Sequence, residues 1–304
     1  MTKIIVILGP TGAGKTEIAL ELAKKFRGEI INADSRQFYR DLVIGTAQPP
    51  ENFFMEVPHH LFGVSPLDDV WDAARFEKEA DQLISAVSGR NHLPLIVGGT
   101  GLYLRALLYG LFSGPAAEKL IRNRLEKRID TEGTRPLYEE LKKIDPQAAI
   151  TIHPNDPVRI IRALEVYEVT GKPISIHQKG HEFRKIKYHC LKLGIQWDRA
   201  KLYDRINKRV DRMIENGLEG EVAGLRQKYG NQPILLRSIG YEEWFPYFDG
   251  KRSREETIDL IKQNSRNLAK RQLTWFRPEK DIVWFEAGDT SGISKAISGF
   301  ISDK

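Results

Sequence analysis

Residues 4–16 read IIVILGPTGAGKT, and this stretch decides the fold of the chain. Its first five residues are apolar and mostly β-branched, which predicts a short strand buried on both faces of a sheet. Residues 17–26 carry apolar side chains at helical spacing, and Gly28 is placed to close that helix. Strand, glycine-rich loop and helix in this order indicate the first unit of a parallel sheet.

The loop between this strand and this helix matches the phosphate-binding pattern G-x-x-x-x-G-K-[ST]. Glycines let successive backbone N–H groups curl round a phosphate, and a helix amino terminus adds a favourable dipole. We expect Lys15 to reach the outer phosphate and the Thr16 hydroxyl to bind Mg²⁺. The predicted phosphate-binding residues are Gly9, Pro10, Thr11, Gly12, Ala13, Gly14, Lys15 and Thr16.

The segments that follow alternate in the same way. Strands separated by helices of this length indicate βαβ units. We therefore expect an α/β fold, a P-loop NTPase-like parallel sheet flanked by helices. The expected strands are residues 29–33, 93–97 and 190–195, and the expected helices are residues 73–87, 199–216 and 254–275.

The middle of the chain has a different pattern. Residues 115–170 are polar with helical spacing of the apolar positions and show no strand-like alternation. We expect an all-helical insertion domain at residues 113–187. The core domain is then formed by residues 1–112 and 188–304.

The composition is that of a folded protein. Hydrophobic residues are 41% and charged residues 29%, which is enough for a sizeable core and excludes a wholly disordered chain. The single cysteine, Cys190, excludes an intrachain disulfide and a multi-cysteine zinc site. The apolar run at the start is too short for a secretory signal, and no run approaches the length of a membrane span. We expect a cytoplasmic monomer that does not bind membranes.

The net charge of +6 is concentrated in the second half of the chain. Residues 179–192, 199–212 and 260–278 are each rich in Lys and Arg. Any one of these segments could be a solvated helix face, but three together favour a polyanionic partner. Two stripes carry much of this charge: Lys201, Arg205, Lys208 and Arg212 on one helix, and Arg266, Lys270 and Arg271 on another.

Asp34 follows the second expected strand, where ligands of open parallel sheets are bound. One interpretation makes it a base or a magnesium partner. The other makes it the N-cap of a helix that starts at Ser35, which Asp suits equally well. The third expected strand runs into Gly98, Gly99 and Thr100, so it lacks the carboxylate that a nucleotide-hydrolysing protein normally places there.

A series of sequence blocks spans nearly the whole chain in order. The blocks are residues 9–16, 34–40, 44–47, 58–61, 98–107, 155–156 with Arg159, 162–167, 170–172, 240–243 and 269–277. In these blocks the chain resembles the tRNA dimethylallyltransferases, the bacterial-type tRNA isopentenyl transferases. Eukaryotic members often carry a C-terminal zinc finger, for which this sequence has no cysteine ligands.

The resemblance implies transfer of a dimethylallyl group from dimethylallyl diphosphate to the exocyclic N6 amine of adenosine 37, beside the anticodon of tRNA. The loop and Mg²⁺ then stabilise the diphosphate leaving group. Asp34 is implied as the acceptor of the amine proton, and Thr100 as a hydrogen-bond partner of the bridging phosphate oxygen. The implied catalytic residues are Asp34, Thr100 and Lys15.

An adenine stacked in an anticodon loop has to be flipped out to reach a buried diphosphate. The resemblance implies that the anticodon stem-loop is gripped between the core and the insertion, with the basic stripes on its phosphates. The implied tRNA-binding residues are Asp34, Ser35, Arg36, Gln37, Thr100, Arg122, Arg159, Ile160, Ile161, Arg162 and Ala163.

Three other functions stay open at the level of the sequence. They are prenyl transfer to free AMP or ADP, a small-molecule P-loop kinase, and a non-catalytic nucleotide-dependent RNA-binding switch. Among the remaining candidates, His59 and His60 lack metal-ligand spacing and are expected to be structural. Trp275 and Phe276 could stack a base, but core packing is the more favoured interpretation.

Overall fold

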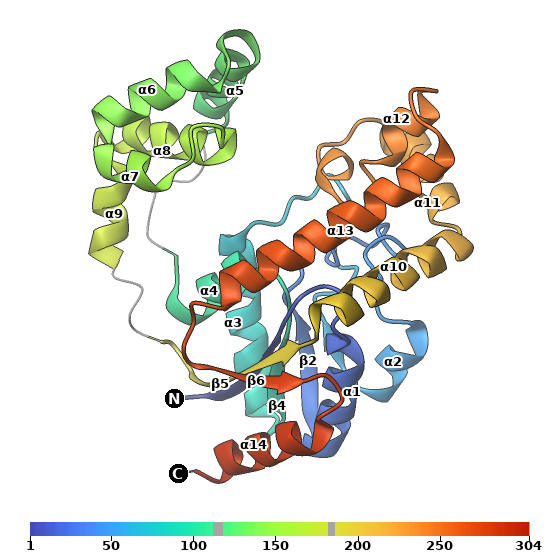
Figure 1. The fold of residues 1–304 in the computed structure, drawn as a ribbon. Helices are drawn as coiled ribbons and strands as arrows, with labels where there is room; N and C mark the ends of the chain where they lie inside the picture. The colour runs from blue at the N-terminus through green and yellow to red at the C-terminus, as the bar shows by residue number, and fades with distance from the viewer. Residues whose placement is uncertain (112–117, 182–185, 304) are drawn as a thin grey trace. The chain divides into compact units, whose positions relative to one another are not determined.

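The computed structural model describes residues 1–111, 118–181 and 186–303 (Figure 1). The chain divides into two compact units. The core unit is Met1–Leu108 with Lys187–Lys304, and the helical unit is Tyr109–Ile186. In the described part of the chain, no helix combines the length and the apolar character needed to cross a membrane.

The core unit contains a six-stranded sheet in the order β3-β2-β4-β1-β5-β6, with every neighbouring pair parallel (Figure 1). All the strands therefore present their carboxyl ends at one edge. The strands are β1 Lys3–Leu8, β2 Gly28–Asn32, β3 His59–His60, β4 Leu93–Gly98, β5 His189–Gln196 and β6 Ile282–Glu286. The expected fold class is confirmed.

The central strand β1 is enclosed on both faces, because Ile4, Ile5, Val6 and Ile7 have no exposed surface. Helices α1 (Lys15–Phe26) and α14 (Thr290–Ser302) share one hydrophobic cluster with the sheet residues that point to their side. Helix α3 (Ala73–Gly89) packs against β2 and β4. Its Phe76 stacks on Tyr103 of α4 (Gly101–Tyr109).

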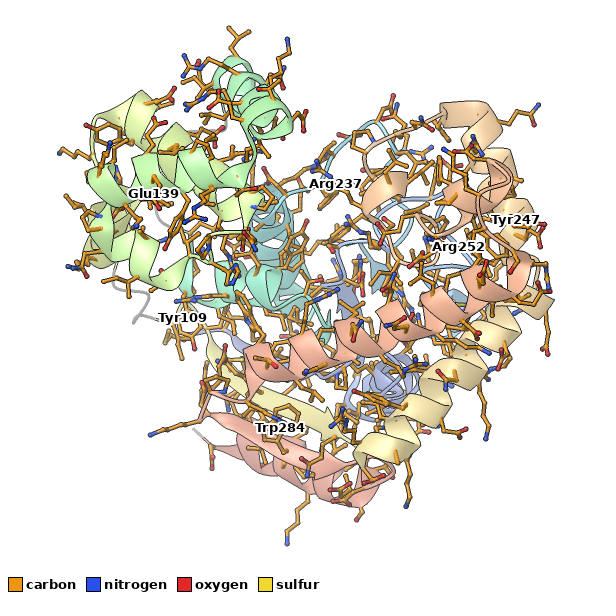
Figure 2. The ribbon with its side chains drawn as sticks, turned by 45° about the horizontal axis from the view of Figure 1, so that its top comes forward. Tyr109, Glu139, Arg237, Tyr247, Arg252 and Trp284 are labelled. Atoms are coloured by element: carbon orange, nitrogen blue, oxygen red, sulfur yellow. The ribbon has the colours of Figure 1, made fainter. Side chains whose placement is uncertain are left out.

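Two long helices lie side by side beyond the carboxyl edge of the sheet, α10 (Arg199–Glu215) and α13 (Arg254–Phe276) (Figure 1). Both follow the expected helical segments closely. Shorter elements complete the core unit: α2 Glu51–Glu56, α11 Leu218–Tyr229, η1 Leu235–Arg237 and α12 Trp244–Phe248. Strand β6 continues the sheet beyond β5, and its Trp284, labelled in Figure 2, lies where a Cβ on Gly194 would have to be.

The helical unit has its own hydrophobic core, formed by residues such as Leu125, Leu141 and Ile160. Its described residues contain helices and no strand, as the sequence pattern predicts. The helices are α5 Lys119–Glu132, α6 Thr134–Ile144, α7 Pro146–Thr151, α8 Pro157–Thr170 and α9 Ile174–His181.

The prediction that Gly28 closes the first helix is wrong. Arg27 takes the left-handed conformation there, with φ 50°, and Gly28 is the first residue of β2. A Cβ on Gly28 would meet the Leu95 side chain, so this glycine serves close packing of β2 on β4. The alternative in which Asp34 caps a helix that starts at Ser35 is also wrong, because turns follow β2.

The carboxylate of Glu29, which is buried and 2% exposed, links the segments at the amino-terminal edge of the sheet by hydrogen bonds. It accepts hydrogen bonds from His60 Nε2 at 2.6 Å, His92 Nδ1 at 2.7 Å and Arg90 Nη2 at 2.8 Å. These residues belong to β3 and to the approach to β4, so Glu29 fixes the short edge strand. His60 is therefore structural, as expected. Likewise His59 Nδ1 lies 2.7 Å from the Val57 carbonyl oxygen.

We predict that Glu29→Gln destabilises the protein by about 3 kcal/mol at neutral pH. Burial raises the pKa of Glu29, but hydrogen bonds from Arg90, His60 and His92 outweigh it and lower the pKa from 4.5 to about 2. The stabilisation is complete above the unfolded-state pKa and is lost as the pH falls through the folded-state pKa.

Thermal unfolding midpoints measured from pH 7 to pH 3 test this. The difference between wild type and Glu29→Gln should narrow below about pH 4.5. The exposed Glu21 of α1 provides the control, since Glu21→Gln should follow wild type throughout. A difference independent of pH would show that the charge of Glu29 is not what stabilises the edge.

Candidate active site

The phosphate-binding loop lies between β1 and α1, at the carboxyl edge of the sheet. Three of its glycines have positive φ: Gly9 at 150°, Gly12 at 79° and Gly14 at 86°. A Cβ on Gly9 would collide with the Ile195 carbonyl oxygen of β5. The sequence pattern is thus required by backbone conformation and by contact with the neighbouring strand.

Lys15 of the loop and two side chains from outside it donate hydrogen bonds to the loop's carbonyl groups. Lys15 Nζ donates to Pro10 O at 2.9 Å, Arg205 Nε to Gly12 O at 3.1 Å, and Trp197 Nε1 to Ala13 O at 3.1 Å. The Arg205 guanidinium also lies over the Trp197 ring, 4.4 Å from its centroid. Because these donors bind the carbonyl groups, backbone N–H groups of the loop can donate hydrogen bonds to an anion.

Lys15 lines the loop cavity. Burial lowers the pKa of its ammonium from 10.5 to about 8, and the charge of Arg209 lowers it too, while Asp34 and Glu17 raise it. An anion bound in the loop would restore the charged form, since opposite charges nearby favour it. Lys15 is therefore matched to a phosphate rather than to a neutral ligand.

Asp34 lies just beyond β2 and is held by Asn32, which is fully buried. Asn32 Oδ1 accepts from Asp34 N at 2.8 Å, and Asn32 Nδ2 donates to Leu61 O at 2.9 Å. Asp34 Oδ1 accepts from Arg36 N at 2.9 Å, which closes a turn instead of capping a helix. This leaves its second oxygen for a ligand.

Two glycines at the end of β4 allow neighbouring segments of the chain to approach the strand closely. A Cβ on Gly98 would collide with the Ala33 backbone, and one on Gly99 would collide with the Gln272 side chain of α13. Gln272 Nε2 donates to Gly99 O at 3.0 Å, and Gln272 Oε1 accepts from Thr11 N at 2.8 Å. The glycines that replace a carboxylate here therefore let α13 reach the phosphate-binding loop.

Thr100 and Arg209 complete the site. Thr100 Oγ1 accepts from Ser35 N at 3.1 Å, so the ends of β2 and β4 are joined beside Asp34. Arg209 of α10 donates to Thr11 Oγ1 at 2.6 Å and to Thr46 O at 3.2 Å. Its Nε is buried and has no hydrogen-bond partner among the described residues.

Two cavities meet at these residues, both within the core unit. The loop cavity, of about 560 Å³, is lined by the phosphate-binding loop, including Lys15 and Thr16. The base cavity, of about 290 Å³, is lined by Ser35, Arg36 and Thr100 and extends to Arg237, which Figure 2 labels. Six residues line both cavities: Thr11, Asp34, Thr46, Arg209, Met213 and Gln272.

The structure therefore brings most of the predicted core residues together, with two changes. Gln37 lines only the loop cavity, and its Nε2 donates to the Thr46 and Ala47 carbonyls. Arg205 and Arg212, expected in a stripe that contacts tRNA, also line the loop cavity. Lys208 of the same stripe is paired with Asp204.

The remaining candidates lie in the helical unit. Ile160, Ile161 and Ala163 are buried in its hydrophobic core, so their side chains are not on its surface. Arg159 is exposed. Arg122 and Arg162 both contact the buried carboxylate of Glu165, at 3.4 and 2.8 Å. Only the arginines among these six can present side chains to a ligand.

Sequence reasoning missed Arg209 and Trp197 as site residues. Arg209 lies one helical turn after Arg205, on the side of α10 that faces the loop. Arg209 could not be singled out because several other basic residues surround it in the sequence, and a helix rich in charged residues is usually exposed to solvent. Of the aromatic pair, Phe276 is buried, while Trp275 packs on Gly101 with part of its surface exposed.

Comparison with known proteins shows the family of the chain. The model of a family described as IPP transferase matches residues 37–279, and an isopentenyl transferase model matches residues 2–63. The chain belongs to the IPP transferase family. It is 47% identical over 287 residues to tRNA dimethylallyltransferase 1 of Pelobacter propionicus, covering 94% of this chain and 93% of the relative.

Solved structures of the family are similar over the whole chain. A full-length tRNA isopentenylpyrophosphate transferase from Bacillus halodurans has a TM-score of 0.74 at 38% identity, covering 99% of this chain and 97% of that one. A eukaryotic dimethylallyltransferase acting on tRNA has a TM-score of 0.84 at 31% identity, covering 99% and 80%. The family resemblance found in the sequence is confirmed.

We predict that Gln272→Met weakens binding of inorganic diphosphate about tenfold, which is about 1.4 kcal/mol. Methionine keeps the length of the side chain but removes both hydrogen bonds, so Thr11 and the loop lose their fixed position. Isothermal titration calorimetry measures the effect. Gln263→Met, at an exposed position of the same helix, is the control and should bind as wild type does. Equal affinity of both variants would contradict the role given to Gln272.

Proposed function

We propose that this protein transfers a dimethylallyl group from dimethylallyl diphosphate to the exocyclic N6 amine of adenosine 37 in tRNA, releasing diphosphate. The observation that carries the proposal is the junction of the two cavities at Asp34. One cavity offers phosphate-binding groups and the other a half-enclosed space beside a carboxylate. A donor diphosphate and an acceptor base therefore meet at one point.

The loop cavity suits the diphosphate. Loop amides, Lys15 and Arg209 supply donors and positive charge where the negative charge of the leaving group grows as the C1–O bond breaks. Magnesium fits this site as well. Thr16 lines the cavity, its hydroxyl makes no hydrogen bond to a described residue, and the described residues contain no carboxylate-rich metal cluster. Mg²⁺ typically binds such sites through few protein ligands and the phosphates themselves.

The base cavity suits the adenine. The N6 lone pair is delocalised into the ring, so attack on C1 of the dimethylallyl group requires removal of a proton from the amine. Asp34 is held by Asn32 and by the turn at Arg36, and its free oxygen serves as the acceptor. Thr100 lines the same cavity, and we infer that its hydroxyl donates to the bridging oxygen of the diphosphate where the two cavities meet.

Transfer RNA is favoured over a free nucleotide as the acceptor. The curated relatives with coverage above nine-tenths are named tRNA dimethylallyltransferases. The helical unit also presents Arg122, Arg159 and Arg162, which suit backbone phosphates. A small-molecule kinase would not need these groups, and the glycines at the end of β4 provide no carboxylate for nucleotide hydrolysis.

Labelled dimethylallyl diphosphate tests the proposal directly. We expect label in an anticodon stem-loop with adenosine at position 37 and none when that base is guanosine. Parallel reactions with AMP and ADP should stay unlabelled. Label in the free nucleotides but not in RNA would instead establish an adenylate isopentenyltransferase.

We predict that Asp34→Asn slows single-turnover transfer by about 10²–10⁴, or roughly 3–5 kcal/mol of barrier. Asparagine keeps the oxygen that accepts from Arg36 N but cannot take up a proton at neutral pH. Thermal stability and diphosphate affinity should therefore change little.

Asp34→Ala separates this role from a structural one. If Asp34 is the base, both variants are slow, and only the alanine variant also loses the turn and some stability. If the carboxylate only closes the turn, Asp34→Asn turns over at nearly the wild-type rate, which would remove Asp34 from the mechanism.

A further inference from the structure

Helix α11 carries two carboxylates, Glu219 and Glu221, whose hydrogen bonds lead to different parts of the core unit. Glu219 accepts from the hydroxyl of Tyr247, labelled in Figure 2, at 3.0 Å and from Arg254 Nε at 2.8 Å. Neither partner lines a cavity, so Glu219 only joins α11 to α12 and α13. Glu221 lines neither cavity itself, but the backbone that it binds belongs to the candidate active site.

Glu221 binds the amide end of the turn at residues 44–47. Ile44 N donates to Glu221 Oε2 at 2.9 Å, and Gly45 N donates to Glu221 Oε1 at 3.2 Å. The Tyr241 hydroxyl donates to the same Oε1 at 2.7 Å, which helps to fix the carboxylate. Backbone amides at the start of a turn need an acceptor, and Glu221 supplies it as a capping residue does at the amino terminus of a helix.

The carbonyl end of the same turn is bound by two side chains of the candidate active site. Gln37 Nε2 donates to Thr46 O at 3.1 Å and to Ala47 O at 3.0 Å. Arg209 Nη2 donates to Thr46 O at 3.2 Å. Ala47 has a φ of 49°, a left-handed conformation that a residue with a side chain keeps only where surrounding contacts fix it. The turn is therefore held at its amides by Glu221 and at its carbonyls by Gln37 and Arg209.

The position of Thr46 O helps to decide where Arg209 places its guanidinium. Arg209 Nη1 donates to Thr11 Oγ1 at 2.6 Å, so the loop and the turn each bind one end of the fork. Arg209 lines both cavities, and burial lowers the pKa of its guanidinium because removing a charge from water is costly. Its charge can stabilise a leaving group only if its acceptors hold it in place, since a displacement of about 1 Å can cost much of the rate.

Resting on the proposed function, we propose that Glu221 is a positioning residue for the transfer reaction. It acts through the turn: the carboxylate holds the amides of Ile44 and Gly45, and the turn then directs Thr46 O to Arg209, which binds the leaving diphosphate. Hydrogen bonds linked in this way polarise one another, so the negative charge of Glu221 strengthens the carbonyl as an acceptor. Helix α11 thereby contributes to the reaction, although none of its residues lines either cavity.

The test is a double-mutant cycle with Glu221→Gln and Arg209→Gln, measured as the affinity for inorganic diphosphate and as the single-turnover transfer rate. Glutamine keeps one acceptor but sets its own NH₂ group against a backbone N–H of the turn. We expect Glu221→Gln alone to weaken diphosphate binding and to slow transfer by about tenfold each, with RNA affinity unchanged. In the Arg209→Gln background, Glu221→Gln should cause almost no further loss, because the side chain that it positions is already absent.

Glu219→Gln is the matched control, because it changes a hydrogen-bonded carboxylate of the same helix. It should lower the thermal midpoint but keep the diphosphate affinity and the transfer rate of wild type. Glu221→Asp is the second variant if Glu221→Gln does not fold, since it keeps the charge and withdraws the carboxylate from the turn, and the same cycle applies to it. Failure of the proposed function would be a different result: wild type would bind diphosphate and label no RNA, and the cycle on diphosphate affinity would still test Glu221.

Losses that multiply in the double variant would overturn the positioning role, because Glu221 would then act independently of Arg209. Equal losses of diphosphate affinity in Glu219→Gln and Glu221→Gln would have the same meaning, since destabilisation of α11 would explain both. A Glu221→Gln variant that binds diphosphate and transfers the label as wild type does would also contradict the proposal.

Discussion

Two hydrogen bonds of the Gln272 side-chain amide, one donated and one accepted, hold the candidate active site together. Its amide joins Thr11 of the phosphate-binding loop to Gly99 at the end of β4, and the helix that carries it comes from a distant part of the chain. The loop, the strand end and α13 are thereby fixed to one another. Because Thr11 and Gln272 line both cavities, this bridge also sets the point at which the cavities meet.

The glycines around this bridge follow from it. Gly98 has to admit the Ala33 backbone and Gly99 the Gln272 amide, so a side chain at either position would push the strand end away from the loop. Gly45 stands in the same relation to the Tyr241 ring, whose hydroxyl donates to Glu221 Oε1 at 2.7 Å. The blocks at residues 44–47, 98–101, 240–243 and 269–277 are therefore parts of one packed structure.

Much of the fold could be predicted because its signals are local. The β-branched run of β1, the loop pattern and the helical spacing of α10 and α13 each depend on neighbouring residues only. The two-residue strand β3 could not be predicted, because pairing with β2 forms it. Strand β6 was missed although its sequence, IVWFE, favours a strand. Gly28 illustrates the limit well, since its role is set by Leu95, a contact that the local pattern cannot reveal.

The residues of the candidate site also fall into those that the sequence could predict and those that it could not. Lys15, Thr16 and Asp34 could be found from a motif and from a position after a strand. Arg209 could not, because only the tertiary structure shows which arginine of a basic helix reaches Thr11. Glu242 and Glu243 are adjacent glutamates in the sequence. Only the structure shows that the Glu243 carboxylate accepts hydrogen bonds from within the protein, from Gly240 N and Asn264 Nδ2.

The central claim is that the donor diphosphate and the acceptor base occupy two cavities that meet at Asp34. A crystal structure with an unreactive thio analogue of dimethylallyl diphosphate and an anticodon stem-loop tests it most directly. The account predicts the diphosphate in the loop cavity on Lys15 and Thr16, the flipped adenine in the base cavity, and N6 within hydrogen-bond distance of the Asp34 carboxylate. An adenine bound in the loop cavity, or an N6 amine directed away from Asp34, would contradict it.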